Sequence, residues 1–257
     1  VAQTNVAGVT LTPGTATQLA VTTQPAATST SGIALVTQPV VTARDTYGNT
    51  DTSFTELITM TEASAGSLTA GATTTAASGV ATFSGLAYTA SADQEAFTLT
   101  ADDQSGVGTD LAATSTIAVT SDVVATKVIV YTNPTSTVSG VSMTQPVIRF
   151  VDAQNTLDAA GNTDVVTASV QSGSGALSGT TTSTASNGVA TFSGLLYSST
   201  TDQSAFVLSF TDDAAGTNAF NGAPVDANST LSNVVATKTI VYTNPTSTVS
   251  GVSMTQP

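Results

Sequence analysis

Six aspartates form two groups whose spacing could bind a metal ion. In each group an Asp-Asp pair follows a Phe-x-Leu pattern, and a third aspartate comes several residues later: Asp102, Asp103 and Asp110, and then Asp212, Asp213 and Asp226. Ca²⁺ takes about six to eight oxygen ligands, and three carboxylates on facing arms of a loop could supply several. The groups predict calcium sites. The alternative is an acidic hairpin whose aspartates only form turns.

A second set of acidic residues surrounds Gly-Asn dipeptides and does not follow the order of an EF-hand loop. Gly-Asn with a preceding aspartate is typical of Asx turns, in which the carboxylate accepts backbone N–H groups close by. We expect turns rather than metal binding here. The residues are Asp45, Asn49 and Asp51, and then Asp152, Asp158, Asn162 and Asp164.

The residue types that most catalysis requires are missing. The chain has no His and no Cys, which excludes a thiol nucleophile, an imidazole base and a zinc site built on those ligands. A glycosidase needs two facing carboxylates in a sugar-binding cleft. Asp93 and Glu95 are two residues apart, but the next repeat has Asp202 and Ser204 instead, and the chain lacks Trp for sugar stacking. We expect no catalytic residues and no cofactor other than calcium.

The charge balance excludes two classes of partner. Four basic residues face 17 acidic ones, giving a net charge of −13, so the chain cannot neutralise a phosphate backbone. No run of uninterrupted apolar residues is long enough to span a bilayer, which takes about 18 or more. We therefore expect neither nucleic-acid binding nor membrane insertion in this segment.

Internal repeats determine the organisation of the chain. Residues 123–146 and 234–257 are the same sequence except for Val128 and Thr239. Residues 16–25 are a more diverged copy of 125–134, and SGVATFSGLAY at 78–88 matches NGVATFSGLLY at 187–197. The repeat of about 110 residues is the size of a whole β-sandwich domain and too long for one turn of a solenoid.

Within each repeat the apolar residues alternate with polar ones, as in half-buried strands. Seven strands are predicted in the first repeat, near 17–23, 36–45, 54–62, 72–77, 79–84, 95–101 and 112–120. The fold class is all-β, with tandem antiparallel β-sandwiches. The predicted core between the sheets is Phe83, Leu86 and Phe97, with Phe192, Leu195 and Phe206 in the second repeat.

These residues resemble the tandem bacterial immunoglobulin-like (Ig-like) domains of large cell-surface proteins and adhesins. The resemblance lies in Thr37-Gln38-Pro39, Asp45 with Gly48-Asn49, the GVATFSGL segment from Gly79, and Phe97 with Leu99. The second repeat has the same order, from Thr144-Gln145-Pro146 through Asp152, Gly161-Asn162 and the segment from Gly188 to Phe206 and Leu208. The resemblance implies Ig-like sandwiches and no particular ligand, because such domains serve as stalks and as binding heads.

The second repeat departs from that pattern in one loop. DTYGNTD at 45–51 is expected to correspond to DAQNTLDAAGNTD at 152–164, an insertion that lengthens the loop. The domains are then 16–124 and 125–235. Residues 1–15 are the last strand of a preceding unit or an N-terminal donor strand. Residues 236–257 are the opening strand of a third, incomplete unit or a strand donated to a neighbour.

The expected function is a non-catalytic, extracellular stalk or fibre of tandem Ig-like domains in a bacterial surface adhesin. The alternative is a self-assembling subunit of a secreted filament, sheath or surface layer, held together by β-strand exchange between chains. In both cases the partners are neighbouring copies of the same domain, and the host or surface ligand is unknown. A glycan- or protein-binding module lacks an aromatic cluster to support it. Asn228-Ser229-Thr230 matches a glycosylation sequon, and we interpret it as a chance match in a Ser/Thr-rich chain.

Overall fold

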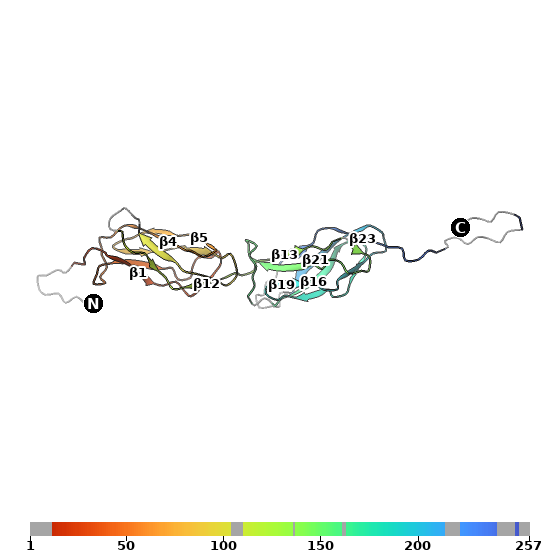
Figure 1. Cartoon of the computed structure of the whole chain (residues 1–257), viewed down its shortest axis with the longest axis horizontal. Helices are drawn as coiled ribbons and strands as arrows, with labels where there is room; N and C mark the ends of the chain where they lie inside the picture. Colours follow the sequence, from red (N-terminus) through yellow and green to blue (C-terminus); the bar gives the residue numbers. More distant parts are fainter. Residues whose placement is uncertain are drawn as a thin grey trace.

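Strands make up all the regular secondary structure in the described residues, which are 12–103, 110–135, 137–160, 163–213, 222–240 and 250–251 of the computed structural model. The strands form two separate sets of sheets, β1–β12 and β13–β23, which we call the first and the second sandwich. They lie end to end, with β12 and β13 on either side of the junction (Figure 1). No described helix is long and apolar enough to cross a bilayer.

In the first sandwich, one sheet has the order β1-β3-β7, and the facing layer is formed by β11-β10-β4-β6 and β2-β12-β9, with the pair β5-β8 beside them. The strands of the first sheet are β1 (Gln18–Thr23), β3 (Val40–Arg44) and β7 (Val80–Thr82). Those of the other groups are β2 (Thr28–Thr30), β4 (Leu57–Thr61), β5 (Ser67–Ala70), β6 (Thr73–Thr75), β8 (Ala87–Thr89), β9 (Glu95–Phe97), β10 (Thr100–Asp103), β11 (Thr114–Ser115) and β12 (Val119–Asp122).

The second sandwich repeats this topology with one change. Its sheets are β13-β15-β19, β14-β23-β21-β16-β18 with β22 paired to β21, and β17-β20. Because β21 runs unbroken where the first sandwich has β9 and β10, two groups of strands merge into one sheet. The strands are β13 (Lys127–Thr132), β14 (Thr137–Val138), β15 (Val147–Val151), β16 (Val165–Ser172), β17 (Ala176–Ser178), β18 (Thr182–Thr184), β19 (Val189–Thr191), β20 (Leu196–Ser198), β21 (Ser204–Asp212), β22 (Val225–Asp226) and β23 (Thr230–Asn233).

The chain crosses between the two layers directly after its first strand. β1 pairs with β3 in one layer, and β2 then pairs with β12 in the other. The β2–β12 pair and its counterpart β14–β23 are parallel, whereas the other strand pairs described are antiparallel. Both units are Ig-like β-sandwiches, as the sequence predicts, except that one edge strand of each runs parallel to its neighbour.

The core lies where it was predicted. Phe83, Leu86 and Phe97 are buried in the first sandwich, and Phe192, Leu195 and Phe206 are buried in the second. Two tyrosines that the sequence analysis did not single out complete the core. Tyr88 stacks on Phe97 with ring centroids 3.8 Å apart, and Tyr197 stacks on Phe206 at the same distance. Stacked aromatic pairs stabilise a core beyond the area that they bury.

The repeated GVATF segment begins with a tight turn that only certain residues can form. Ser78 and Gly79 both have positive φ, and so do Asn187 and Gly188. Two successive residues of this conformation make the two-residue hairpin turn that suits the twist of antiparallel strands. A side chain at Gly79 would also collide with the backbone carbonyl of Asp51. Gly is therefore required there both by the turn and by the neighbouring loop.

Candidate functional site

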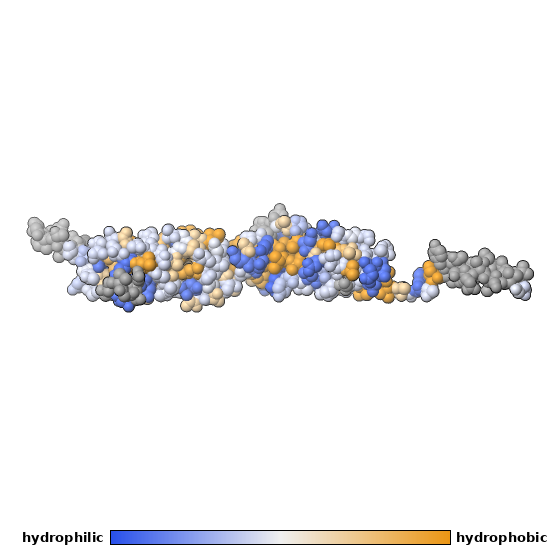
Figure 2. All heavy atoms as spheres, turned by 90° about the horizontal axis from the view of Figure 1, so that it is seen from above, coloured by the Kyte–Doolittle hydropathy of each residue, from blue (hydrophilic) through white to orange (hydrophobic). Residues whose placement is uncertain are grey.

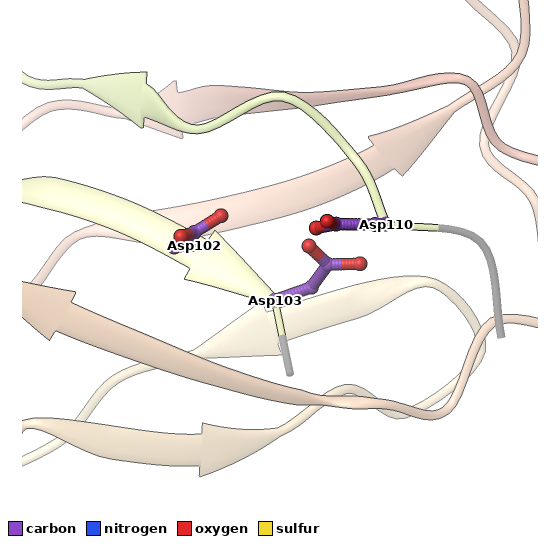
Figure 3. Close-up of side chains that lie close together, drawn as sticks. All are labelled: Asp102, Asp103 and Asp110. Carbon is purple, nitrogen blue, oxygen red and sulfur yellow. The ribbon is translucent and has the colours of Figure 1, made fainter. Parts of the chain in front are cut away.

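The first acidic group lies where β10 ends and the chain returns toward β11. Asp102, Asp103 and Asp110 each offer a carboxylate oxygen, and these three atoms lie within 4.8 Å of one another. Figure 3 shows Asp103 and Asp110 facing each other, with Asp102 beside them on β10. Asp103 is buried, whereas Asp102 and Asp110 are exposed. The structure thus brings together all three residues that the sequence predicted for this site.

Asp103 is the anchor of this group. Both of its carboxylate oxygens accept the backbone N–H of Leu111, at 3.2 and 3.3 Å. Burial raises the pKa of Asp103, the bond from Leu111 lowers it, and the charges of Asp110 and Asp102 raise it again. The net direction is upward. The ionised form of this group is therefore destabilised where it lies, and a cation would relieve that cost.

A fourth acid, Glu56, belongs to the same neighbourhood and was not predicted. It directly precedes β4, whose Ile58 pairs with Asp103. Its Oε2 atom is buried and has no hydrogen-bond partner. Burial raises the pKa of Glu56, and the charges of Asp103 and Asp110 raise it further. The sequence did contain a sign of this position. Glu56 lies two residues before the buried Ile58 and four before the buried Met60, and residues at this spacing share one face of a strand.

The second acidic group differs from the prediction by one member. The oxygens of Asp164, Asp212 and Asp213 lie within 4.8 Å of one another. Asp226 is not in this group, because it lies on β22 opposite Ser209 of β21. Asp164 takes its place. It precedes β16 as Glu56 precedes β4, and its carbonyl accepts the N–H of Ala185 as that of Glu56 accepts the N–H of Ala76.

The two aspartate pairs are also offset by one residue. Asp103 pairs with Ile58, and Asp212 pairs with the equivalent Val166, so these two aspartates correspond. Asp102 then corresponds to Thr211, and Asp213 lies one residue further along the chain. Asp213 accepts the backbone N–H of Val165 at 3.1 Å. The interpretation that the pairs recur at the same place is therefore wrong by one position.

Both groups consist of oxygen donors only, which suits a hard divalent cation such as Ca²⁺ and no softer metal. Asp164 and Asp212 are 0% and 4% exposed, so two carboxylates of the second group are almost wholly removed from water. Buried like charges need protons, hydrogen bonds or a cation. Calcium binding stays a prediction for both groups.

The Gly-Asn loop of the first sandwich forms the Asx turn that was expected. Asp45 accepts the N–H groups of Tyr47 and Asn49, both at 2.9 Å, and the N–H of Gly14 at 3.0 Å. Burial by itself would raise the pKa of Asp45, but the hydrogen bonds from Asn49, Gly14 and Tyr47 lower it to about 2. This aspartate is a structural acceptor.

The equivalent loop of the second sandwich shows that the predicted insertion is wrong. Asp152 accepts the N–H groups of Gln154 and Thr156, as Asp45 does in its own loop. Asp158 accepts the N–H of Ala125 at 3.0 Å, and Asp51 accepts that of Ala16 at 2.8 Å. Residues 152–158 therefore match residues 45–51 with no insertion. The extra residue lies later, before Asp164, and the expected Gly161-Asn162 turn falls outside the described residues.

The remaining carboxylates that a glycosidase reading would use are hydrogen-bonded to nearby backbone. Glu95 accepts the N–H groups of Ala65, Gly66 and Ser91, at 3.0, 2.9 and 2.6 Å. Burial raises the pKa of Glu95, and the bonds from Ser91, Tyr88 and Gly66 more than reverse this, so the pKa is lowered. Glu95 fixes two loops together, which gives it a structural role.

Asp93 connects the two sandwiches. Its Oδ1 accepts the N–H groups of Gln94 and Val123, at 2.9 and 2.8 Å, within the first sandwich. Its Oδ2 accepts those of Ala159 and Ala160, at 3.1 and 2.6 Å, from the loop between β15 and β16 of the second. We call this contact the joint. The sequence analysis weighed Asp93 only as a catalytic acid and missed this role.

No family model matches the chain, and no curated protein matches it. Among solved structures it is similar to FdeC, an Escherichia coli adhesin, with 18% identity, a TM-score of 0.38 and coverage of 87% of this chain and 66% of that one. It is also similar to the D00-D0 domain of intimin, with 13% identity, a TM-score of 0.38 and coverage of 83% and 98%. A family 2 glycosyl hydrolase of Bacteroides cellulosilyticus is similar at 9% identity and a TM-score of 0.33, covering 77% of this chain and 23% of the enzyme.

Proposed function

We propose that this chain is part of a non-catalytic, extracellular stalk in a bacterial surface protein of the adhesin type. The observation that carries the proposal is the joint. Two copies of one sandwich lie end to end (Figure 1), and four backbone N–H groups from both sides of the junction meet a single carboxylate. Repeats that contact only their neighbours add length with each copy, which is what a stalk requires.

The surface supports a role outside the cell. Charged residues are 8% of the chain, and the exposed strand positions are mostly Thr, Ser and Ala. Figure 2 shows mostly pale, near-neutral hydropathy over the first sandwich in this view, whereas the second sandwich has blue and orange patches side by side. Two of the acidic side chains, Asp45 and Glu95, are engaged in a turn and in a contact between loops.

The test is the location and size of the native polypeptide. Antibodies raised against residues 12–240 should label intact cells, and protease added outside the cells should remove the signal. In denaturant the polypeptide should have a mass several times the 25.4 kDa of this sequence. Labelling only after lysis would contradict a stalk at the cell surface.

A second candidate function is a filament, sheath or surface-layer subunit held by strand exchange between chains. It is favoured by residues 234–240, which repeat 123–129 but for one residue. Ala125 is buried in the second sandwich and Ile129 is half-buried, whereas Ala236 is exposed and Ile240 is 67% exposed. An exposed segment of this kind, which has the sequence of a strand in the second sandwich, could complete the sheet of another molecule. A denatured mass close to 25.4 kDa, with multimers that resist detergent, would favour this candidate over the stalk.

A further inference from the structure

The end of the second sandwich has the same aspartate, with the same two backbone hydrogen bonds, that the first sandwich contributes to the joint. Asp202 occupies the position of Asp93, and its Oδ1 accepts the N–H groups of Gln203 and Val234, both at 2.9 Å. These are the counterparts of the bonds that Asp93 accepts from Gln94 and Val123. Gln94 and Gln203 have nearly the same backbone conformation, with φ of 57° and 52°. The turn that presents the carboxylate is therefore the same in both units.

The other oxygen of this carboxylate differs between the two ends. Oδ2 of Asp93 accepts two N–H groups of the second sandwich, and Asp93 is half-buried. Oδ2 of Asp202 accepts no hydrogen bond from the part of the chain that the structure describes, and Asp202 is exposed. An ionised carboxylate oxygen held in a fixed direction is a strong acceptor for a pair of backbone N–H groups.

A neighbouring apolar side chain shows the same difference. Val123 and Val234 both follow the last strand of their sandwich, and the backbone N–H of Val123 donates to Asp93 as that of Val234 donates to Asp202. Val123 is 1% exposed, whereas Val234 is 37% exposed. The end of the second sandwich thus has an apolar residue that is uncovered where its counterpart in the joint is covered.

Charge also favours a contact at this end. In the joint, Asp93 lies near Asp122 and Asp158, and burial together with the charge of Asp93 raises the pKa of both. In the second sandwich Asn233 replaces Asp122 and accepts the side-chain amide of Gln203 at 3.2 Å. One negative charge is therefore absent, so a partner carrying an aspartate at the position of Asp158 meets less repulsion there.

We propose that Asp202, Asn233 and Val234 form a docking surface for a following unit of the second-sandwich type. The occupant is that unit's Asp-Ala-Ala loop segment, the counterpart of residues 158–160, whose two alanine N–H groups would bind Oδ2 of Asp202. This inference rests on the proposed stalk and names the contact that fixes its units in line. Residues 234–257 repeat 123–146 except at Thr239, so the connection to such a unit has nearly the same sequence as the connection between the two sandwiches.

The experiment measures the spread of orientations at this second joint. The full chain is extended after Pro257 by a second copy of residues 147–235, which completes a third sandwich. Because the chain has no Cys, spin labels can be attached at Thr191→Cys and at its counterpart in the added sandwich. Labels at Thr82→Cys and Thr191→Cys measure the first joint in the same way. Thr82 and Thr191 are both exposed. Pulsed electron spin resonance gives the distribution of distances.

Asp202→Asn is the decisive variant, because the amide keeps one oxygen for Gln203 and Val234 but replaces the other with a donor. We expect a narrow distribution at the second joint, similar in width to the first, that becomes about twofold wider in Asp202→Asn, since units without a fixed contact move freely. Asp93→Asn should widen the first joint. Asp226→Asn, with the same charge change on an exposed strand, should widen neither.

A broad distribution in the unsubstituted extended protein, or one that Asp202→Asn leaves unchanged, would overturn the inference. So would a first joint that stays narrow in Asp93→Asn. A thermal melting curve of each variant is the control that tests whether the third sandwich is folded. A broad second joint in a protein found on intact cells would reject this contact and leave the stalk standing. A narrow distance distribution at the second joint, in a protein found only inside cells, would support this contact and reject the stalk.

Discussion

The carboxylates of this chain differ chiefly in what surrounds them. Asp45 and Asp51 are buried among N–H and hydroxyl donors, and both have a lowered pKa. Asp103 and Glu56 are removed from water beside other acids, and both have a raised pKa. The same residue type therefore stabilises the fold as an anion in one loop and opposes it in another. The pH at which each group titrates decides how the two effects combine.

The first prediction is a maximum of stability in mildly acidic solution. A raised pKa means that stability is lost as the pH rises through that pKa, so protonating Glu56, Asp103, Asp122 and Asp158 between neutral pH and their ordinary values of 4.5 and 3.8 should stabilise the protein. A lowered pKa means that stability is lost as the pH falls below 3.8, toward about 2 for Asp45. Urea unfolding across this range should therefore show a rise and then a fall.

Two variants separate these contributions. Glu56→Gln should flatten the rise on the neutral side, because the group that it removes is destabilised as an anion. Asp45→Asn should destabilise the protein at neutral pH and flatten the fall on the acid side. A steady loss of stability from pH 7 down to pH 4 would contradict the raised values.

The second prediction concerns the aromatic core. Phe83 and Phe192 are equivalent and 1% exposed. Phe→Ala at either position should cost about 3–5 kcal/mol, because it leaves a cavity in a packed core as well as losing buried area. Urea unfolding of the full chain should show the loss in the transition of the sandwich that carries the change. Tyr47→Ala, at a side chain that is 84% exposed, is the control and should change stability by less than about 0.5 kcal/mol. A cost below about 1 kcal/mol at Phe83 would contradict the core assignment.

At the scale of elements, apolar alternation predicted the strands that pack against the core. β1, β3, β4, β6 and β7 lie within the predicted ranges, and the last two ranges each contain one short strand and the start of the next. β2, β5 and β8 were missed because they are short or rich in Ser and Thr, so no alternation marks them. Ile117 has the parity of Val119 but is 47% exposed, since it lies between β11 and β12, where the chain changes pairing partner.

The candidate sites were predictable only where they lie close together in sequence. Asp102, Asp103 and Asp110 fall on two arms of one loop, and the sequence identified them. Glu56 and Asp164 come from another strand, and only the pairing of that strand with β10 or β21 brings them near. The loops 45–51 and 152–158 were misaligned because the sequence comparison placed Gly48-Asn49 opposite Gly161-Asn162. The hydrogen bonds of Asp45 and Asp152 show the correct alignment. In the second sandwich Asn155, with φ of 70°, takes the positive-φ place of Gly48.

The third prediction is that calcium stabilises the loops that carry the acidic groups. Millimolar Ca²⁺ should raise the melting temperature and a chelator should lower it. At a hundredfold excess over Kd, bound Ca²⁺ would add about 2.7 kcal/mol to the free energy of unfolding. Asp103→Asn and Asp212→Asn should each remove the effect in their own sandwich, whereas Asp226→Asn should not, because it lies outside the second group. Mg²⁺ should substitute poorly, since it keeps its waters in a small octahedral shell. Identical melting curves in calcium and chelator at matched ionic strength would leave the aspartates as turn residues.

At the scale of the whole molecule, the joint is a small contact between two large cores. Each sandwich buries its own cluster of aromatic and aliphatic side chains. Across the junction the main polar contact is the pair of bonds from Ala159 and Ala160 to Asp93. Such an arrangement behaves as two folding units with one nearest-neighbour energy between them.

The last prediction follows from that division. Phe192→Ala should open a window of urea concentration in which the second sandwich is unfolded and the first is folded. In that window the first sandwich should lose only the energy of the joint, about 1–3 kcal/mol for charge-assisted hydrogen bonds that leave a carboxylate unpaired. Asp93→Asn in the full chain should cost the first sandwich a similar amount. In the double variant the two losses should not add, because both remove the same contact. Additive losses would mean that the sandwiches are coupled through some other contact. A first sandwich that unfolds together with the second would mean that the two form one cooperative unit rather than two segments of a stalk.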